Sequence, residues 1–198
     1  MINNLSVYFT EKLLSNGTIN DEDKELYIYG LFMLLSQLMF FIITCIFGLI
    51  LKCILESIIF YIAFQFIRKY AGGYHASTET RCEISTTLSI LACIVLIRLS
   101  KTYDFQIALV TITVISAISI FCLCPLDTPE KPLSDKEFRY FRKISWLILF
   151  VIITVITVSY IFKLSIIIVP CCLSLILESI LLALGKIKRV SQKNNVKT

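Results

Sequence analysis

The sequence predicts an all-α fold, that of a polytopic helical membrane protein with about six transmembrane helices. Of its 198 residues, 57% are hydrophobic and only 17% are charged, and the mean hydropathy is +0.83. One soluble core could not bury that much apolar side chain. A helix needs about 20 mainly apolar residues to cross a bilayer, because the hydrocarbon layer is about 30 Å thick. The predicted spans are Leu26–Leu51, Cys53–Ile67, Ile84–Leu99, Phe105–Leu123, Ile144–Phe162 and Leu164–Leu184.

The N-terminal residues, 1–25, form the first predicted element. From Ile2 to Leu13, apolar side chains recur at spacings of three and four residues, and Asn16–Gly17 then supplies a stop. This pattern predicts a short amphipathic helix that lies on the inner leaflet or packs on the bundle of spans. The region lacks the residue order of a signal peptide, so no leader is expected to be removed.

The second and third predicted spans, Cys53–Ile67 and Ile84–Leu99, are short. We expect them to tilt little, to thin the bilayer around them or to be partly re-entrant. A model with four crossings, in which both segments dip into the membrane from one side, is the alternative. Five crossings are disfavoured, because an odd number would place one basic terminus outside.

Lysine and arginine gather on one predicted side of the membrane. With the N-terminus inside, 15 of the 19 fall in inner segments, as in cytoplasmic loops. The sequence therefore predicts a multi-pass protein of the cell membrane with both termini and residues 68–82 on the cytoplasmic side. This basic face is expected to attract anionic lipids. Nucleic acid is not an expected partner, because no basic and aromatic domain lies outside the predicted spans.

The longest polar connection lies within residues 125–143. Its three prolines, Pro125, Pro129 and Pro132, prevent a continuous helix, whereas Ser134 and Glu137 have the spacing of a capping box. We therefore expect a stiff cytoplasmic turn that leads into a basic helix start. Four basic residues of this loop could also dock an acidic substrate: Lys131, Arg139, Arg142 and Lys143.

Two acidic residues and most cysteines fall within predicted spans. Glu56 lies near an outer boundary and is expected to snorkel to the headgroups, whereas Glu178 is left open between a structural and a functional role. Seven cysteines are expected to be packing residues, and no metal or other cofactor is predicted, because no histidine lies near them. These cysteines are Cys45, Cys53, Cys93, Cys122, Cys124, Cys171 and Cys172.

The polar stretch from Arg68 to Cys82 differs from the rest of the chain. It holds the only histidine, His75, an adjacent glycine pair, and Cys82 as the one cysteine with polar neighbours. A thiol becomes a useful nucleophile when a base removes its proton or when positive charge favours the thiolate. The stretch predicts a Cys–His dyad, although an interfacial histidine and a chance cysteine would share this spacing.

Geometry restricts how this dyad can form. In one continuous helix, the two side chains would lie about 10 Å apart along the axis. Ser77 is a good N-cap, so a helix is expected to begin at Thr78, while Gly72–Gly73 would let the backbone fold back. A cysteine near that helix start and beside Arg81 would favour its thiolate. Two residues are candidates for orienting the imidazole, Glu79 and Gln37.

The same stretch resembles the signature of the accessory gene regulator protein B (AgrB) family, membrane peptidases of Gram-positive quorum sensing. Two motifs carry the resemblance, Arg68…Gly73–Tyr–His75–Ala…Cys82 and a later Pro–x–Asp–x–Pro–x–Lys–Pro turn at 125–132. Chain length and the layout of hydropathy agree over the whole sequence. The resemblance implies that Cys82 and His75 are the catalytic pair and that Arg68 and Gly73 are needed for activity.

The resemblance further implies a single membrane-embedded domain, 1–198, that acts as a cysteine endopeptidase and forms a homodimer. The expected substrate is an AgrD-like propeptide, whose C-terminal part is removed. The retained piece stays on the enzyme as a thioester until an internal cysteine or serine closes a thiolactone or lactone ring. A non-catalytic exporter would need ionisable residues along a pathway, and few are present. A scaffold would explain the basic loops but not the polar stretch.

Overall fold

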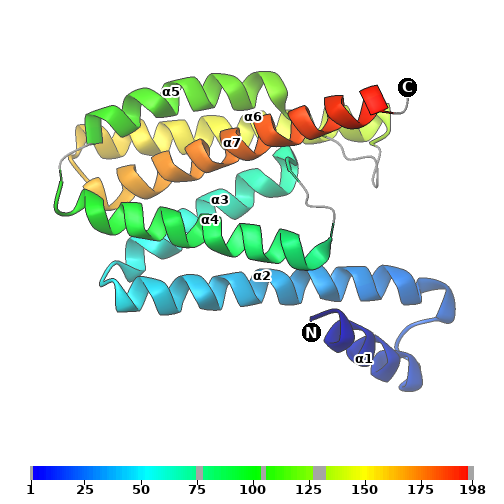
Figure 1. Ribbon diagram of the computed structural model, residues 1–198. Coiled ribbons are helices and arrows are strands. Elements are labelled where there is room, and N and C mark those ends of the chain that lie inside the picture. Colours follow the sequence, from blue (N-terminus) through cyan, green and yellow to red (C-terminus); the bar gives the residue numbers. More distant parts are fainter. Residues whose placement is uncertain (1, 75–77, 104–105, 127–132, 196–198) are drawn as a thin grey trace. The chain divides into compact units, whose positions relative to one another are not determined.

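The computed structural model describes residues 2–74, 78–103, 106–126 and 133–195 (Figure 1). Within these ranges the chain forms seven α-helices, one short 3-10 turn at Asp21–Asp23, and no β-strand. The predicted all-α membrane fold is therefore confirmed. The helices are α1 (Ile2–Ser15), α2 (Lys24–Ile50), α3 (Ile54–Ala71), α4 (Glu79–Ser100), α5 (Gln106–Leu123), α6 (Asp135–Ile161) and α7 (Ser165–Asn195).

Each predicted span coincides with one helix, from α2 to α7. Several helices run beyond the predicted ends, where charged residues follow the apolar run: α3 continues to Ala71, α4 begins at Glu79, and α7 reaches Asn195. Hydropathy detects only the part of a helix that suits lipid, whereas backbone hydrogen bonds continue into the polar flanks. These extra turns place the polar stretch between two helix ends.

Four of the described helices are long and apolar enough to cross a bilayer, by length and composition. They comprise Asp21–Ile50, Thr80–Ser100, Asp135–Ile161 and Ser165–Ser191, and the apolar part of α5, Ile107–Leu123, is shorter. The third predicted span is thus not short, since α4 has 22 residues. Helix α3 has 18 residues but includes Glu56, Arg68 and Lys69. The crossings of α3 and α5 stay predictions.

The described chain divides into two compact units, Met1–Ile43 and Thr44–Thr198. In the first unit, α1 ends where the sequence predicted, because Gly17 has a φ of +67° and the Thr18 amide donates to the Leu13 carbonyl over 3.0 Å. Lys24 Nζ lies 3.8 Å from Glu11 Oε1. The expected amphipathic helix is present, and its position on the inner leaflet stays a prediction.

The second unit is organised around α7, which packs against α3, α5 and α6 (Figure 1). Large apolar side chains from these helices are fully or almost fully buried: Phe60 and Phe64 on α3, Ile120 on α5, Leu149 on α6, and Leu175 and Leu182 on α7. Helix α7 is therefore the central element of the packing in this unit.

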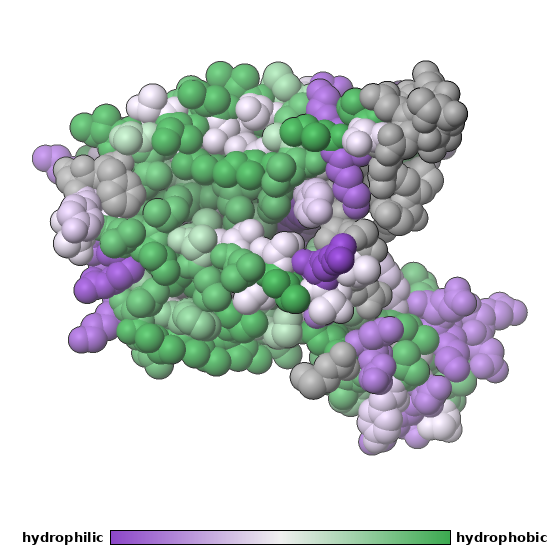
Figure 2. Space-filling model, viewed as in Figure 1, coloured by the Kyte–Doolittle hydropathy of each residue, from purple (hydrophilic) through white to green (hydrophobic). Residues whose placement is uncertain are grey.

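Apolar side chains also cover the outside of this second unit. Figure 2 shows them over most of the visible sides of its helices, and they include Ile115 at 65% exposure and Ile161 at 70%. Monomeric soluble proteins rarely expose contiguous apolar patches above a few hundred Å². A lipid environment around these helices accounts for the exposed apolar surface.

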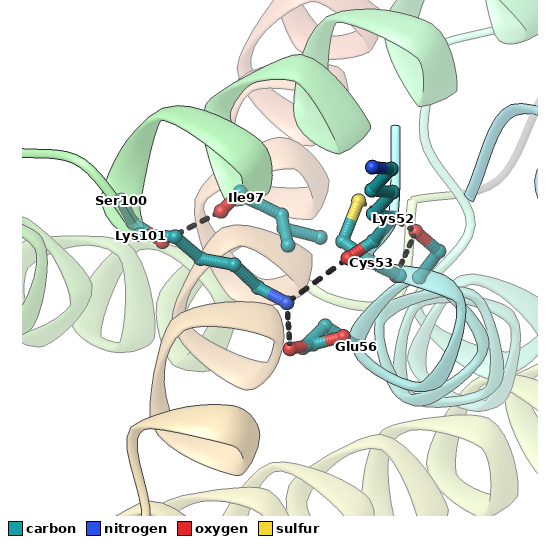
Figure 3. A network of polar contacts seen from close by, with 7 residues as sticks. Lys52, Cys53, Glu56, Ile97, Ser100 and Lys101 are labelled. Carbon is teal, nitrogen blue, oxygen red and sulfur yellow. Dashed lines mark hydrogen bonds and ion pairs between the residues drawn. The ribbon is translucent and has the colours of Figure 1, made fainter. Parts of the chain in front are cut away.

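At the N-terminal end of α3, a polar cluster replaces the expected snorkelling of Glu56 (Figure 3). Lys101 Nζ lies 2.6 Å from Glu56 Oε1 and donates a hydrogen bond to the Lys52 carbonyl over 3.3 Å. The Glu56 side chain is only 11% exposed. The prediction was wrong because a lysine just beyond α4, 45 positions away in the sequence, supplies the countercharge that a desolvated carboxylate needs.

Candidate active site

The polar stretch connects α3 to α4, and its first part turns sharply at two glycines. Helix α3 ends at Ala71, and Gly72 and Gly73 have φ values of +77° and +129°. Residues with side chains rarely adopt this region, because the Cβ atom collides with the backbone. The glycine pair therefore adopts backbone conformations that turn the chain, and the approach of His75 to Cys82 that we expected from this turn stays a prediction.

Arg68, in the last turn of α3, holds the backbone that follows these glycines. Its Nη1 donates to the Gly72 carbonyl over 2.7 Å, and its Nη2 donates to the Tyr74 carbonyl over 2.6 Å. A Cβ atom added to Gly73 would collide with Arg68 Nη1. The guanidinium thus fits a backbone path that only glycine allows at position 73.

Helix α7 holds the same segment from a second side. The Tyr74 amide donates to the Leu181 carbonyl over 2.9 Å, and Lys188 Nζ lies 5.4 Å from the centre of the Tyr74 ring. Gly185 faces the segment so closely that an added Cβ would lie 2.9 Å from Gly73 C and from Tyr74 N. The segment is therefore clamped between Arg68 and one face of α7.

The start of the proline-rich loop provides a third contact. The Leu126 amide donates to the Ala71 carbonyl over 2.9 Å, and Leu126 pairs with Gly72 in an isolated parallel bridge. A Cβ atom on Gly72 would collide with the Leu126 carbonyl oxygen. The two sequence motifs that lie about fifty residues apart thus meet in space. Residues 127–132, including Lys131, lie outside the described residues.

Cys82 lies at the end of the first turn of α4. Thr78 caps this helix, with its Oγ1 accepting a hydrogen bond from the Arg81 amide over 3.4 Å, and the Cys82 amide donates to the Thr78 carbonyl over 3.0 Å. Cys82 is half-buried. The expected helix start at Thr78 was therefore early by one residue, because Thr78 itself has the extended conformation of an N-cap.

His75 and Ser77 lie outside the described residues, so the pairing of His75 with Cys82 stays a prediction. The chain still limits the separation of the two helix ends. Tyr74 and Thr78 are four residues apart, so their Cα atoms are at most about 14 Å from each other. The start of α4 is thereby tethered to the segment that Arg68 and α7 hold. Of the candidates for orienting the imidazole, Gln37 belongs to the first unit.

Three of the four predicted docking residues, Arg139, Arg142 and Lys143, lie near the start of α6. The capping box is confirmed, since the Ser134 amide donates to Glu137 Oε2 over 2.9 Å and the Glu137 amide donates to Ser134 Oγ over 3.4 Å. Arg139, Arg142 and Lys143 are exposed, and the Arg142 guanidinium lies 4.7 Å from the centre of the Trp146 ring. They are accessible to a partner, and their role in docking stays a prediction.

The other cysteines differ from Cys82 in exposure or position. Cys53, Cys93, Cys124, Cys171 and Cys172 are buried, as packing residues should be. Burial raises the pKa of the Cys124 thiol above its ordinary value. Cys122 was expected to be a packing residue, but its side chain is exposed on α5.

A model of the accessory gene regulator B family matches residues 6–182. The chain belongs to the accessory gene regulator B family. An AgrB-like protein of Clostridium perfringens (strain SM101) is 32% identical over 152 residues, which cover 72% of this chain and 70% of the relative. AgrB-like protein 2 of Clostridium perfringens (strain 13) is 30% identical over the same shares. An AgrB-like protein of Listeria innocua is 29% identical over 139 residues, 68% of this chain and 66% of the relative. No solved structure matches.

The AgrB-family match runs across both units and includes the whole polar stretch. The resemblance inferred from the two motifs is thus confirmed. Sequence reasoning missed the α7 residues that hold the segment, Leu181 and Gly185. An isolated glycine within a helical pattern was the available signal for Gly185, since such a residue usually has a packing reason.

Gly185→Ala is expected to lower the free energy of unfolding by about 1–3 kcal/mol, because the new methyl group would force α7 away from Gly73 and Tyr74. The thermal midpoint of the purified protein in detergent measures this change. Gly30→Ala is the matched control, since no described atom lies within 4 Å of a Cβ built there. Equal midpoints for the two variants would contradict the close approach of α7.

Proposed function

We propose that this chain is a membrane cysteine endopeptidase that processes an AgrD-like propeptide of a quorum-sensing system. The observation that carries the proposal is the backbone turn at Gly72–Tyr74, which Arg68 and α7 fix directly before His75 in the chain. Membership of the AgrB family supports the regulatory role. Cys82 adds a half-exposed thiol at the first turn of the next helix.

The proposed reaction begins with attack of Cys82 Sγ on a peptide carbonyl of the precursor. A carbon–sulfur bond forms, the carbon–nitrogen bond breaks, and His75 transfers a proton to the leaving amine. The N-terminal part of the precursor is then held as a thioester. A thiol or hydroxyl of the precursor attacks this thioester and gives its proton to His75, which closes a thiolactone or lactone ring, breaks the carbon–sulfur bond to the enzyme and returns the thiolate of Cys82.

The proposed setting is the cytoplasmic face of the cell membrane, with both termini on that side. Basic residues there are expected to bind anionic lipids and to attract an acidic tail of the precursor. Lys131, Arg139, Arg142 and Lys143 are the candidates for docking that tail. A single functional domain over 1–198 and a homodimer complete the proposal.

The direct test is to trap the thioester. The protein is co-expressed with its precursor, quenched at acidic pH, and analysed by intact-protein mass spectrometry. We expect an added mass equal to the truncated precursor, located on the peptide that contains Cys82 and released by hydroxylamine. An adduct on another cysteine, or cleavage by the protein with no adduct under any quenching time, would count against the covalent mechanism.

A non-catalytic exporter or a membrane scaffold is the second candidate. Transport or recruitment of the precursor by a protein in which Cys82 is replaced would support this candidate. Within the described residues, the buried acids of the second unit are Glu56 and Glu178. Each lies within 4.0 Å of a basic partner, which is more typical of fixed pairs than of an ion pathway.

A further inference from the structure

Glu178 is a fully buried carboxylate in the middle of α7. Its exposed fraction is 0%, and neither of its oxygens has a hydrogen-bond partner among the described residues. Its Oε2 lies 3.9 Å from Arg68 Nη1, which is its one ion pair in this part of the chain. An acidic side chain is costly in such a place, so its position requires a reason.

The Arg68 guanidinium in turn lacks a countercharge among its hydrogen-bond partners. Its two hydrogen bonds go to the carbonyls of Gly72 and Tyr74, which are neutral acceptors and leave its charge uncompensated. The side chain is only 18% exposed, so water screens little of that charge. Glu178 is the acidic residue that the structure places beside it, and Nη1 is the nitrogen that faces both Glu178 and the Gly72 carbonyl.

Helix α7 presents three of its contacts with the polar stretch along one face. Glu178, Leu181 and Gly185 are spaced by three and four residues, so they lie on the same side of the helix. Glu178 meets Arg68, the Leu181 carbonyl accepts from the Tyr74 amide, and Gly185 abuts Gly73 and Tyr74. The carboxylate is therefore part of a row of contacts that ends at the residue before His75.

We infer that Glu178 is a positioning residue of the peptidase: its carboxylate fixes the Arg68 guanidinium, and through it the backbone that leads into His75. The inference rests on the proposed function. It goes beyond a contribution to stability, because a buried ion pair is often no more stabilising than apolar residues of the same volume. The best-attested use of such a pair is to specify one arrangement of the elements that carry it. Misplacing a catalytic group by about 1 Å can reduce the rate about 100-fold.

The first test compares Glu178→Gln with wild type in cleavage of a synthetic precursor by the full-length protein in lipid vesicles. We expect kcat to fall about 10-fold to 100-fold while KM stays within about 3-fold, because the variant misplaces the reacting groups without touching the precursor. Glu56→Gln is the matched control. It neutralises the other buried, ion-paired acid, at the opposite end of α3, and is expected to leave kcat unchanged.

The second test asks whether Glu178 acts through Arg68. The variants Arg68→Gln, Glu178→Gln and the double variant form a cycle. If the carboxylate works only through the guanidinium, the double variant has the same kcat as Arg68→Gln, so the two losses do not add. Losses that multiply would overturn the inference, as would a wild-type kcat for Glu178→Gln.

The double variant also tests the inference if Glu178→Gln alone fails to fold. It leaves no unpaired charge buried, so it is expected to fold, and a wild-type kcat for it would overturn the inference. Cys82→Ala is measured beside these proteins. Full cleavage by Cys82→Ala would refute the proposed peptidase itself, whereas an inactive Cys82→Ala with a fully active Glu178→Gln would refute only the role of Glu178.

Discussion

Cys82→Ala is expected to abolish cleavage of the precursor, with a loss in kcat of roughly 1,000-fold or more. The sulfur is the atom that forms the bond to the substrate in the proposed reaction, and alanine offers no replacement. Its side chain is half-buried at the surface of the first turn of α4, so its removal leaves no large cavity and the protein should accumulate normally. His75→Ala should cause a comparable loss, because the thiol would lack its base.

The measurement is mass spectrometry of the precursor and its products in cells that co-express both genes, with immunoblots for the amount of enzyme. Cys122→Ala is the matched control, since it removes an exposed cysteine outside the polar stretch. It should process the precursor at the wild-type rate. Normal processing by Cys82→Ala at wild-type abundance would rule out the proposed nucleophile, and normal processing by His75→Ala would rule out the proposed base.

The helices could be predicted from the sequence because their cause is local. Long apolar runs determine where lipid surrounds the chain, and in that environment each backbone amide must be paired within its own segment. The predicted spans stopped short of the helix ends at Ala71 and Glu79, since polar residues that continue a helix give no hydropathy signal. The N-cap at Thr78 in place of Ser77 has a different cause, because either of two adjacent hydroxyl residues can cap a helix and the sequence does not say which one does.

The contacts that hold the site could not be predicted in the same way. Arg68 and Gly73 were expected only from a resemblance, and the structure shows a physical link between them: the guanidinium occupies the space that a side chain at position 73 would need. Leu126 and Leu181 meet the segment from about 50 and 110 positions away. A single sequence reports spacing within one element, not which distant elements meet.

The two buried acids illustrate this limit from opposite sides. Glu56 and Glu178 both interrupt apolar segments. From their distance to a predicted span boundary, Glu56 was expected to snorkel to the headgroups, and the role of Glu178 was left open. Both instead have a basic partner on another element, Lys101 for the first and Arg68 for the second. The cost of burying a charge predicts that a partner exists, while only the packing of α3, α4 and α7 shows which residue it is.

Gly73→Ala is expected to reduce cleavage at least about 100-fold, although neither Cys82 nor His75 is substituted. Two effects act together at this position. A φ of +129° is strained for a residue with a side chain, at a cost of about 1–3 kcal/mol, and the new Cβ would collide with Arg68 Nη1. Either Arg68 gives up its hydrogen bonds to the Gly72 and Tyr74 carbonyls, or the backbone before His75 moves.

Two further variants, Gly17→Ala and Arg68→Lys, separate these effects. Gly17 has a φ of +67°, with no described atom within 4 Å of a Cβ built there, so Gly17→Ala carries backbone strain alone. Arg68→Lys keeps a positive charge but cannot donate to two carbonyls as a planar fork. If the collision with the guanidinium is decisive, Gly73→Ala and Arg68→Lys should lose kcat to a similar extent, and Gly17→Ala should keep it.

The same comparison can refute the role of the turn. Each variant is assayed for kcat and for the thermal midpoint, because a loss of stability alone lowers the amount of active enzyme without changing kcat per folded molecule. Wild-type kcat in folded Gly73→Ala would show that the path fixed by Arg68 is not needed for the chemistry. A low kcat with an intact thioester adduct on Cys82 would instead place the defect after acylation, at ring closure.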